Sequence, residues 1–224
     1  FNYILALDAS SSMLANDFSP NRMTVAKENA QNFVNSLNAE VKIGVVSFSG
    51  VTRVETALTG DKKLVNNMID KIDISSAGGT DISGAIMTSV NLLVIEPDKA
   101  KAVIVLTDGQ QTVGSPLEEG INYAVGKNVV VHTIGMATEK GGEFELTQLL
   151  STLDAASLKN IADNTGGKYF IAGDKTSMDA AFKEIVNLSE QNIPHQLRLP
   201  FLIAGLLLLL IEWVLISTRF RTLP

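Results

Sequence analysis

The sequence predicts an α/β fold: a doubly wound, mostly parallel, six-stranded sheet with one antiparallel edge strand, followed by a C-terminal transmembrane helix. Two observations predict the sheet. Short apolar runs rich in β-branched residues recur along the chain, and segments with helical spacing of apolar residues lie between them. A third observation, an almost uniformly apolar stretch near the C-terminus, predicts the membrane helix.

Four apolar runs are nearly continuous rather than alternating, which is typical of parallel strands buried on both faces. They are YILAL (3–7), VKIGVVSF (41–48), AVIVLT (102–107) and NVVVHTIG (128–135). TRVET (52–56) alternates between apolar and polar residues and predicts a short edge strand. GKYFIA (167–172) predicts the last strand of the sheet.

Six segments between these runs have the apolar spacing of helices. They are Met23–Leu37, Lys62–Ile72, Ile82–Ile95, Leu117–Val125, Ala155–Ala162 and Ser177–Leu188. The resulting order of strands and helices fits a Rossmann-like sheet, in which ligands bind beyond the carboxyl ends of the strands. The polar segment 139–153 is expected to be a surface insertion with one weak helical patch over 144–150.

Composition limits the classes of function. The chain has 224 residues, no cysteine and a formal charge of -6. Without cysteine it has no disulfide and no thiolate metal site. The acidic balance, without a basic run before the apolar stretch, argues against nucleic acid as a partner and favours cations. The chain begins with Phe1 inside a strand pattern, so we expect residues to be missing upstream.

The apolar stretch 200–218 is long enough, as a helix, to span a hydrocarbon core. The alternative is a buried core helix, which rarely lacks any polar face over such a length. Arg219 and Arg221 follow at once, so the positive-inside rule predicts a cytoplasmic C-terminus, a cell-membrane location and a domain outside the cytoplasm. The expected segments are a domain over 1–190, a linker over 191–199, the transmembrane helix over 200–218 and a basic cytoplasmic tail over 219–224.

Oxygen-bearing side chains lie in three of the predicted loops. The first strand ends in Asp8, Ser10 and Ser12, the segment before the third helix contains Thr80, and the strand 102–107 ends at Asp108. In a parallel sheet all three loops open at the same edge, so two carboxylates and three hydroxyls converge. Alternation along an extended backbone would direct residues 8, 10 and 12 to one side, and Gly78 and Gly79 would allow a close approach.

This donor set suits a hard divalent cation such as Mg²⁺, with Mn²⁺ or Ca²⁺ as alternatives. Neutral hydroxyl ligands leave a positively charged centre that can bind an external carboxylate without any bond being broken. Each loop also has a simpler explanation. The serines can cap or turn the chain, Thr80 or Asp81 can cap the following helix, and Asp108 can belong to an ordinary turn.

DASSS, GGT and TDG resemble, in order and spacing, the metal-ion-dependent adhesion site (MIDAS) of von Willebrand factor A domains. The resemblance covers residues 2 to about 190. It implies that Ser10 and Ser12 ligate the metal directly, that Thr80 does so in a high-affinity state, and that Asp8 and Asp108 act mostly through water. It also implies that a partner Asp or Glu completes the metal shell. The family usually has Gly between the two serines, where this chain has Ser11.

Longer phrases are similar to bacterial Bat-type membrane proteins, which are often linked with MoxR-type AAA+ ATPases. These phrases are SSSMLANDFSPNRMTVAKENA, LTDGQQTVG and TGGKYF. The resemblance implies a membrane-anchored, metal-dependent module that binds a protein with an exposed Asp or Glu. Other membrane subunits, a MoxR-like ATPase and the lipid bilayer are further expected partners.

The sequence leaves two other functions as alternatives. A Mg²⁺-dependent phosphoryl-transfer enzyme with an aspartyl nucleophile needs a second Asp two residues after the first, where this chain has Ser10. His132 lies within an apolar strand and is expected to belong to the core. The other alternative is a metal-free structural scaffold. The sequence therefore predicts a binding module and no enzymatic activity.

Overall fold

The structure is a computed structural model that describes residues 1–96, 99–136, 142–144, 147–151, 153–191 and 198–218. The chain divides into two compact units, Phe1–Glu190 and Gln191–Pro224. The first unit contains the sheet, its flanking helices and all residues of the predicted site. The two units are described separately.

The main sheet has six strands in the order β3-β2-β1-β4-β5-β8. Their bounds are β1 Asn2–Asp8, β2 Ile43–Phe48, β3 Thr52–Thr59, β4 Lys101–Thr107, β5 Val130–Met136 and β8 Tyr169–Ala172. Strand β3 runs antiparallel to β2, whereas all other neighbours are parallel. The predicted mostly parallel sheet with one antiparallel edge strand is confirmed.

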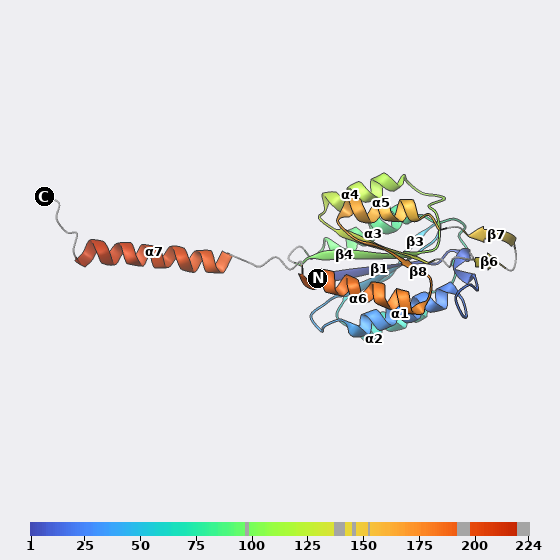
Figure 1. Cartoon of the computed structure of the whole chain (residues 1–224), viewed down its shortest axis with the longest axis horizontal. Helices are drawn as coiled ribbons and strands as arrows, with labels where there is room; N and C mark the ends of the chain where they lie inside the picture. The colour runs from blue at the N-terminus through green and yellow to red at the C-terminus, as the bar shows by residue number, and fades with distance from the viewer. Residues whose placement is uncertain (97–98, 137–141, 145–146, 152, 192–197, 219–224) are drawn as a thin grey trace. The chain divides into compact units, whose positions relative to one another are not determined.

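Helices cover both faces of this sheet (Figure 1). Helices α1, α2 and α6 lie on one face, and α3, α4 and α5 lie on the other. Their bounds are α1 Arg22–Ser36, α2 Lys62–Asp70, α3 Ile82–Leu93, α4 Leu117–Gly126, α5 Ala155–Thr165 and α6 Lys175–Gln191. The six predicted helices are all present, with ends that differ by a few residues.

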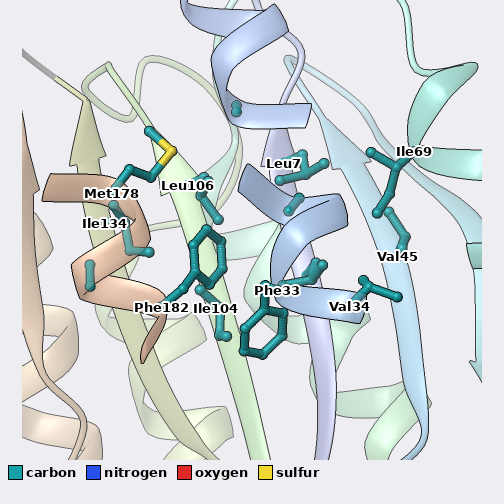
Figure 2. Close-up of a cluster of buried hydrophobic side chains, with 14 of the residues drawn as sticks. Leu7, Phe33, Val34, Val45, Ile69, Ile104, Leu106, Ile134, Met178 and Phe182 are labelled. Carbon is teal, nitrogen blue, oxygen red and sulfur yellow. The ribbon is translucent and has the colours of Figure 1, made fainter. Parts of the chain in front are cut away.

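The core splits into two layers because successive strand residues face opposite sides of the sheet. Leu5 and Leu7 of β1 face α1 and α6, whereas Ile4 and Ala6 face α3. Figure 2 shows the first layer, in which Phe33 of α1 and Phe182 of α6 meet over the sheet with ring centroids 4.8 Å apart. This packing explains why the strands read as continuous apolar runs.

The first backbone N–H groups of a helix have no acceptor within the helix, and polar side chains at the helix starts accept hydrogen bonds from them. The Asn21 side chain accepts from the backbone N–H of Thr24 at 2.8 Å and begins α1. Asp81 accepts from the N–H of Gly84 at 2.8 Å and begins α3. Of the two residues considered for this cap, Asp81 therefore takes the role and Thr80 does not.

The insertion differs from the prediction. Strands β6 Gly142–Phe144 and β7 Thr147–Ser151 pair antiparallel in a separate two-stranded sheet, so the helical patch expected over 144–150 is wrong. A short apolar run fits either a helix or a strand by spacing alone, and here pairing between the two strands decides. Residues 137–141, 145–146 and 152 of the insertion lie outside the described residues.

The C-terminal unit contains helix α7, Arg198–Thr218. A helix was expected over 200–218, but no helix in the described part of the chain is long and apolar enough to cross a membrane. A span needs about 20 apolar residues in a row, and the side chains of α7 are described only from Phe201 to Val214. The predicted transmembrane segment is therefore not supported. Most of the expected linker, 192–197, and the expected tail, 219–224, lie outside the described residues.

Candidate metal centre

The predicted site residues meet at the carboxyl edge of the sheet, where β1 and β4 lie side by side. Helix α1, which follows β1, packs on one face of the sheet, and α4, which follows β4, packs on the other. The two connections therefore separate at this point, which is where ligands bind in such sheets. Asp8 ends β1, and Asp108 comes directly after β4.

A chain of hydrogen bonds joins four of the five predicted residues. The Ser10 backbone N–H donates to Asp8 Oδ1 at 2.8 Å, and the Ser10 and Ser12 hydroxyl oxygens are 3.0 Å apart. The Ser12 hydroxyl donates to Asp108 Oδ1 at 2.7 Å, across 96 positions of sequence. The other oxygen of Asp8, Oδ2, accepts from the Thr107 hydroxyl at 2.5 Å. The first and third predicted loops are thus directly connected.

The backbone route to this arrangement differs from the expected one. The extended strand ends at Asp8, and Ser11–Leu14 form a turn of 3-10 helix. Ser10 remains extended, with φ −70° and ψ 161°. The expected alternation of an extended chain through residue 12 is therefore wrong. The turn, closed by the Met13 N–H donating to the Ser10 carbonyl at 3.1 Å, brings the Ser12 hydroxyl back towards Ser10.

Thr80 reaches the same region from the loop before α3. Its side chain is buried, and its hydroxyl oxygen lies 3.9 Å from the place where a Cβ on Gly109 would stand, beside Asp108. The backbone N–H of Thr80 donates to the Thr112 hydroxyl at 2.9 Å, and the Thr112 N–H donates to the Thr80 carbonyl at 3.0 Å. These two bonds fix the second predicted loop against the third.

One of the two glycines in this loop has the expected role. Gly79 has φ +88°, and a Cβ there would stand 2.9 Å from both methyl groups of Val113. At Gly78, by contrast, a Cβ would meet nothing within 4 Å, so the close approach expected there is wrong. The tight contact is made from the other side. A Cβ on Gly50 would stand 2.0 Å from the Gly78 carbonyl oxygen.

The two carboxylates are fully buried, and this sets their electrostatics. Asp8 and Asp108 are both 0% exposed. Burial, followed by repulsion from Asp108, raises the pKa of Asp8 to about 7, although hydrogen bonds from Ser10 and Thr107 oppose the shift. A buried carboxyl group such as Asp8, whose pKa is raised in this way, gains from a nearby cation when it ionises.

Arg22 supplies one cation, and sequence reasoning did not identify it. Its side chain is 0% exposed and forms ion pairs with Asp17 and Asp108. Burial opposes the charge of the guanidinium, but Asp17 and Asp108 outweigh that effect and raise the pKa of Arg22 above its usual value. Charged residues in a polar loop usually lie in solvent, so ANDFSPNRM contains no signal for this buried cluster beyond the pair of opposite charges itself.

The residues present fit a hard divalent cation. The donors are hydroxyl and carboxylate oxygens, which Mg²⁺, Mn²⁺ and Ca²⁺ prefer. Within the described residues, no three His, Asp or Glu side chains gather in a way that could hold a metal ion. A metal here would therefore depend on the hydroxyls of Ser10, Ser12 and Thr80 in addition to Asp8 and Asp108.

His132 has no part in this site. It lies in β5, is 4% exposed, and accepts through Nδ1 from the Lys168 backbone N–H at 3.1 Å. Burial lowers the pKa of His132 to about 4. The predicted core role of this residue is confirmed.

Comparison with known proteins agrees with this geometry. Residues 3–111 match the family model described as the von Willebrand factor type A domain. A UPF0353 protein of Mycolicibacterium gilvum is 28% identical over 202 residues, which cover 84% of this chain and 59% of the relative. An uncharacterized protein of Borreliella burgdorferi is 25% identical over 234 residues, which cover 94% of this chain and 67% of the relative. The aligned region therefore spans only part of these relatives.

Solved structures share the fold over most of the chain. BatB of Bacteroides thetaiotaomicron has a TM-score of 0.73 at 24% identity, covering 84% of this chain and 98% of that one. An aerotolerance-related membrane protein of Bacteroides fragilis has a TM-score of 0.73 at 23% identity, covering 86% of this chain and 99% of that one. A mussel byssus protein, proximal thread matrix protein 1 with a zinc-occupied MIDAS motif, has a TM-score of 0.66 at 20% identity, covering 84% and 47%. The chain thus resembles von Willebrand factor type A domains in sequence over residues 3–111 and shares the fold of these proteins.

Proposed function

We propose that residues 1–190 are a von Willebrand factor type A domain that binds a protein partner through a divalent metal ion. The observation that carries this proposal is the hydrogen-bond chain from Asp8 through Ser10 and Ser12 to Asp108, with Thr80 beside it. An arrangement that only closed a turn would not need two buried carboxylates from distant parts of the chain. Similarity to a protein whose MIDAS motif holds zinc supports the same conclusion.

In this proposal the hydroxyls of Ser10, Ser12 and Thr80 ligate the ion directly, and Asp8 and Asp108 act through water. The ion is Mg²⁺, with Mn²⁺ and Ca²⁺ as alternatives. Bound there, it supplies a positive centre that accepts an oxygen ligand from outside the chain. Neutral hydroxyls do not cancel its charge, so the carboxylate of a partner Asp or Glu is the ligand that suits it.

The proposal involves no catalytic step. In phosphoryl-transfer enzymes with an aspartyl nucleophile, a second carboxylate follows two residues after the first. Ser10 stands there, and its hydroxyl lies against that of Ser12. Incubation with aryl phosphates and Mg²⁺ is expected to give no turnover above that of an Asp8→Asn variant. Turnover that depends on Asp8 would contradict this part of the proposal.

The partner is proposed to be a protein that presents an exposed acidic side chain. The neighbour from Bacteroides fragilis is described as a membrane protein, which favours a search among membrane-associated proteins. The resemblance to Bat-type proteins adds a MoxR-type AAA+ ATPase to the partners to be tested.

Metal binding is tested by thermal unfolding of the whole chain in EDTA and in Mg²⁺, Mn²⁺ or Ca²⁺. An ion that binds only the folded state at one hundred times its Kd adds about 2.7 kcal/mol, which is roughly 5–10 °C in Tm for a chain of this size. The shift should vanish in Asp8→Asn and remain in Asp73→Asn, which removes an exposed carboxylate from the loop before Ser75. Equal shifts in the two variants would refute the assigned site.

Binding of an external carboxylate to the metal ion is tested by titrating Mn²⁺ in acetate and in chloride at equal ionic strength. Acetate should tighten Mn²⁺ binding to the wild-type chain, because it can occupy the position proposed for the partner carboxylate. Identical affinities in the two salts would argue against a metal centre that recognises carboxylates.

A further inference from the structure

Arg22 is buried between two carboxylates that belong to different parts of the domain. Its Nε donates to Asp17 Oδ1 at 2.8 Å, and its Nη2 donates to Asp17 Oδ2 at 2.7 Å. Its Nη1 donates to Asp108 Oδ2. We infer that Arg22 is a positioning residue for the metal centre. Arg22 fixes the carboxylate of Asp108 in place, and Asp17 orients the Arg22 guanidinium so that it can do so. The inference rests on the proposed function.

The geometry assigns a separate task to each side of the guanidinium. Asp17 takes two nitrogens as a bidentate pair, which fixes the plane of the group. The remaining Nη1 donates to Asp108 Oδ2, while Asp108 Oδ1 accepts from the Ser12 hydroxyl at 2.7 Å. Both oxygens of Asp108 are therefore held, and its carboxylate cannot rotate without losing one of these bonds.

The connection also ties the loop after β1 to the loop after β4. Asp17 lies between the 3-10 turn and α1, and Arg22 is the first residue of α1. The Arg22 backbone N–H donates to the Ala15 carbonyl at 3.1 Å, which anchors the residue to the segment that follows Ser12. Movement of either loop would therefore change the position of Asp108 relative to the Ser12 hydroxyl.

Burial excludes direct recognition of a partner by Arg22. Its side chain is 0% exposed, and that of Asp17 is 6% exposed. A charged group out of reach of solvent acts on what it touches, and Asp17 and Asp108 are among the groups that the Arg22 side chain contacts. Lys cannot replace this function, because an ammonium is a point charge without the planar fork that spans two carboxylates.

Mn²⁺ titration of the whole chain tests the inference with two variants. Arg22→Lys retains the charge but loses the fork, and it is expected to weaken Mn²⁺ binding about 10- to 100-fold, the range for residues that orient metal ligands. Asp17→Asn is isosteric, leaves all five residues of the proposed site in place, and is expected to weaken Mn²⁺ binding about 10-fold. Glu28→Gln is the matched control on α1, because Glu28 forms an exposed pair with Lys175 at 2.6 Å and should leave binding unchanged.

A double-mutant cycle separates positioning from general loosening of the fold. If Asp17 acts through Arg22 and Asp108, then Asp17→Asn should cause little further loss of Mn²⁺ affinity in an Asp108→Asn background. A merely structural role predicts losses that multiply in full. Circular dichroism and melting in EDTA establish that each variant is folded before its affinity is compared.

Wild-type Mn²⁺ affinity in both folded variants would overturn the inference, as would losses that multiply in full. Tighter binding in Arg22→Lys would also overturn it, because Arg22 would then compete with the metal. If Arg22→Lys does not fold, Asp17→Asn and its cycle decide. A wild-type chain that binds no Mn²⁺ refutes the proposed function and this inference together, whereas normal binding in the wild type and in every folded variant refutes this inference alone.

Discussion

Replacing Asp8 by Asn removes a buried negative charge and is expected to stabilise the metal-free protein. Asp8 is 0% exposed and lies close to Asp108, and together burial and repulsion raise its pKa from 3.8 to about 7. The folded chain therefore retains the Asp8 proton up to about pH 7, whereas the unfolded chain releases it near pH 4. The contribution of Asp8 to the stability of the metal-free wild-type protein should therefore fall as pH rises from 4 to 8.

The size of this effect follows from the shift. A shift of about three pKa units, at 1.36 kcal/mol each, means that ionised Asp8 lowers the free energy of unfolding by roughly 4 kcal/mol above pH 7. Asn can still accept from the Ser10 N–H but loses one of the two accepting oxygens, which offsets about 1 kcal/mol. Asp8→Asn should therefore be about 3 kcal/mol more stable than wild type in EDTA at pH 8, and this advantage should disappear near pH 4.

Urea unfolding in EDTA at pH 4, 6 and 8 measures this difference, and a change in midpoint at constant slope isolates stability. Asp73→Asn serves as the control for loss of an exposed carboxylate. In saturating Mg²⁺ the difference in free energy of unfolding between Asp8→Asn and wild type should shrink or reverse, because only the wild type is stabilised by the ion. If Asp8→Asn is no more stable than wild type at pH 8, or if its advantage does not grow with pH, the electrostatic account of the site is refuted.

Three further predictions concern the core and the loops. The Phe33 ring is 2% exposed and lies between Tyr3 and Phe182 at centroid distances of 5.4 and 4.8 Å. Phe33→Ala should therefore lower the free energy of unfolding in urea by about 3–5 kcal/mol. A loss below 1 kcal/mol would contradict this packing. The folded state holds His132 neutral down to about pH 4, whereas the unfolded state protonates it near pH 6.5. His132→Asn should therefore remove up to about 3 kcal/mol of the destabilisation that the wild type suffers as pH falls from 6.5 to 4. Curves of unfolding free energy against pH that superimpose for the two proteins would contradict this. Gly79→Ala should cost about 1–3 kcal/mol, because φ is +88° and the added Cβ meets Val113 at 2.9 Å, and Gly78→Ala, with no neighbour within 4 Å, is its matched control.

The sheet could be predicted because burial on both faces leaves a direct trace in the sequence. Leu5 pairs with Val45 on one side and Ile104 on the other, and such central positions accept only apolar side chains. The antiparallel edge could be predicted for the opposite reason. Strand β3 is half-buried or exposed at every position, and its mixture of polar and apolar residues records this contact with water. The insertion was predicted less well, because pairing between β6 and β7 leaves no such trace.

The site was predicted as a set of residues and less well as a geometry. Asp8 and Asp108 converge because parallel strands end at one edge, which depends on topology alone. The 3-10 turn at Ser11–Leu14 and the Arg22 cluster depend on three-dimensional contacts between loops, which residue spacing does not encode. A charged residue in a polar segment predicts exposure, so a buried guanidinium is visible only once its two carboxylates are placed around it.

The most direct test of a metal centre at this edge of the sheet is anomalous scattering from crystals of the chain saturated with Mn²⁺. A bound Mn²⁺ ion should give one strong peak beside the hydroxyls of Ser10, Ser12 and Thr80, and this peak should be lost in Asp8→Asn crystals. Well-ordered wild-type crystals with these residues in their present arrangement and no peak among them would contradict a metal centre at this edge of the sheet.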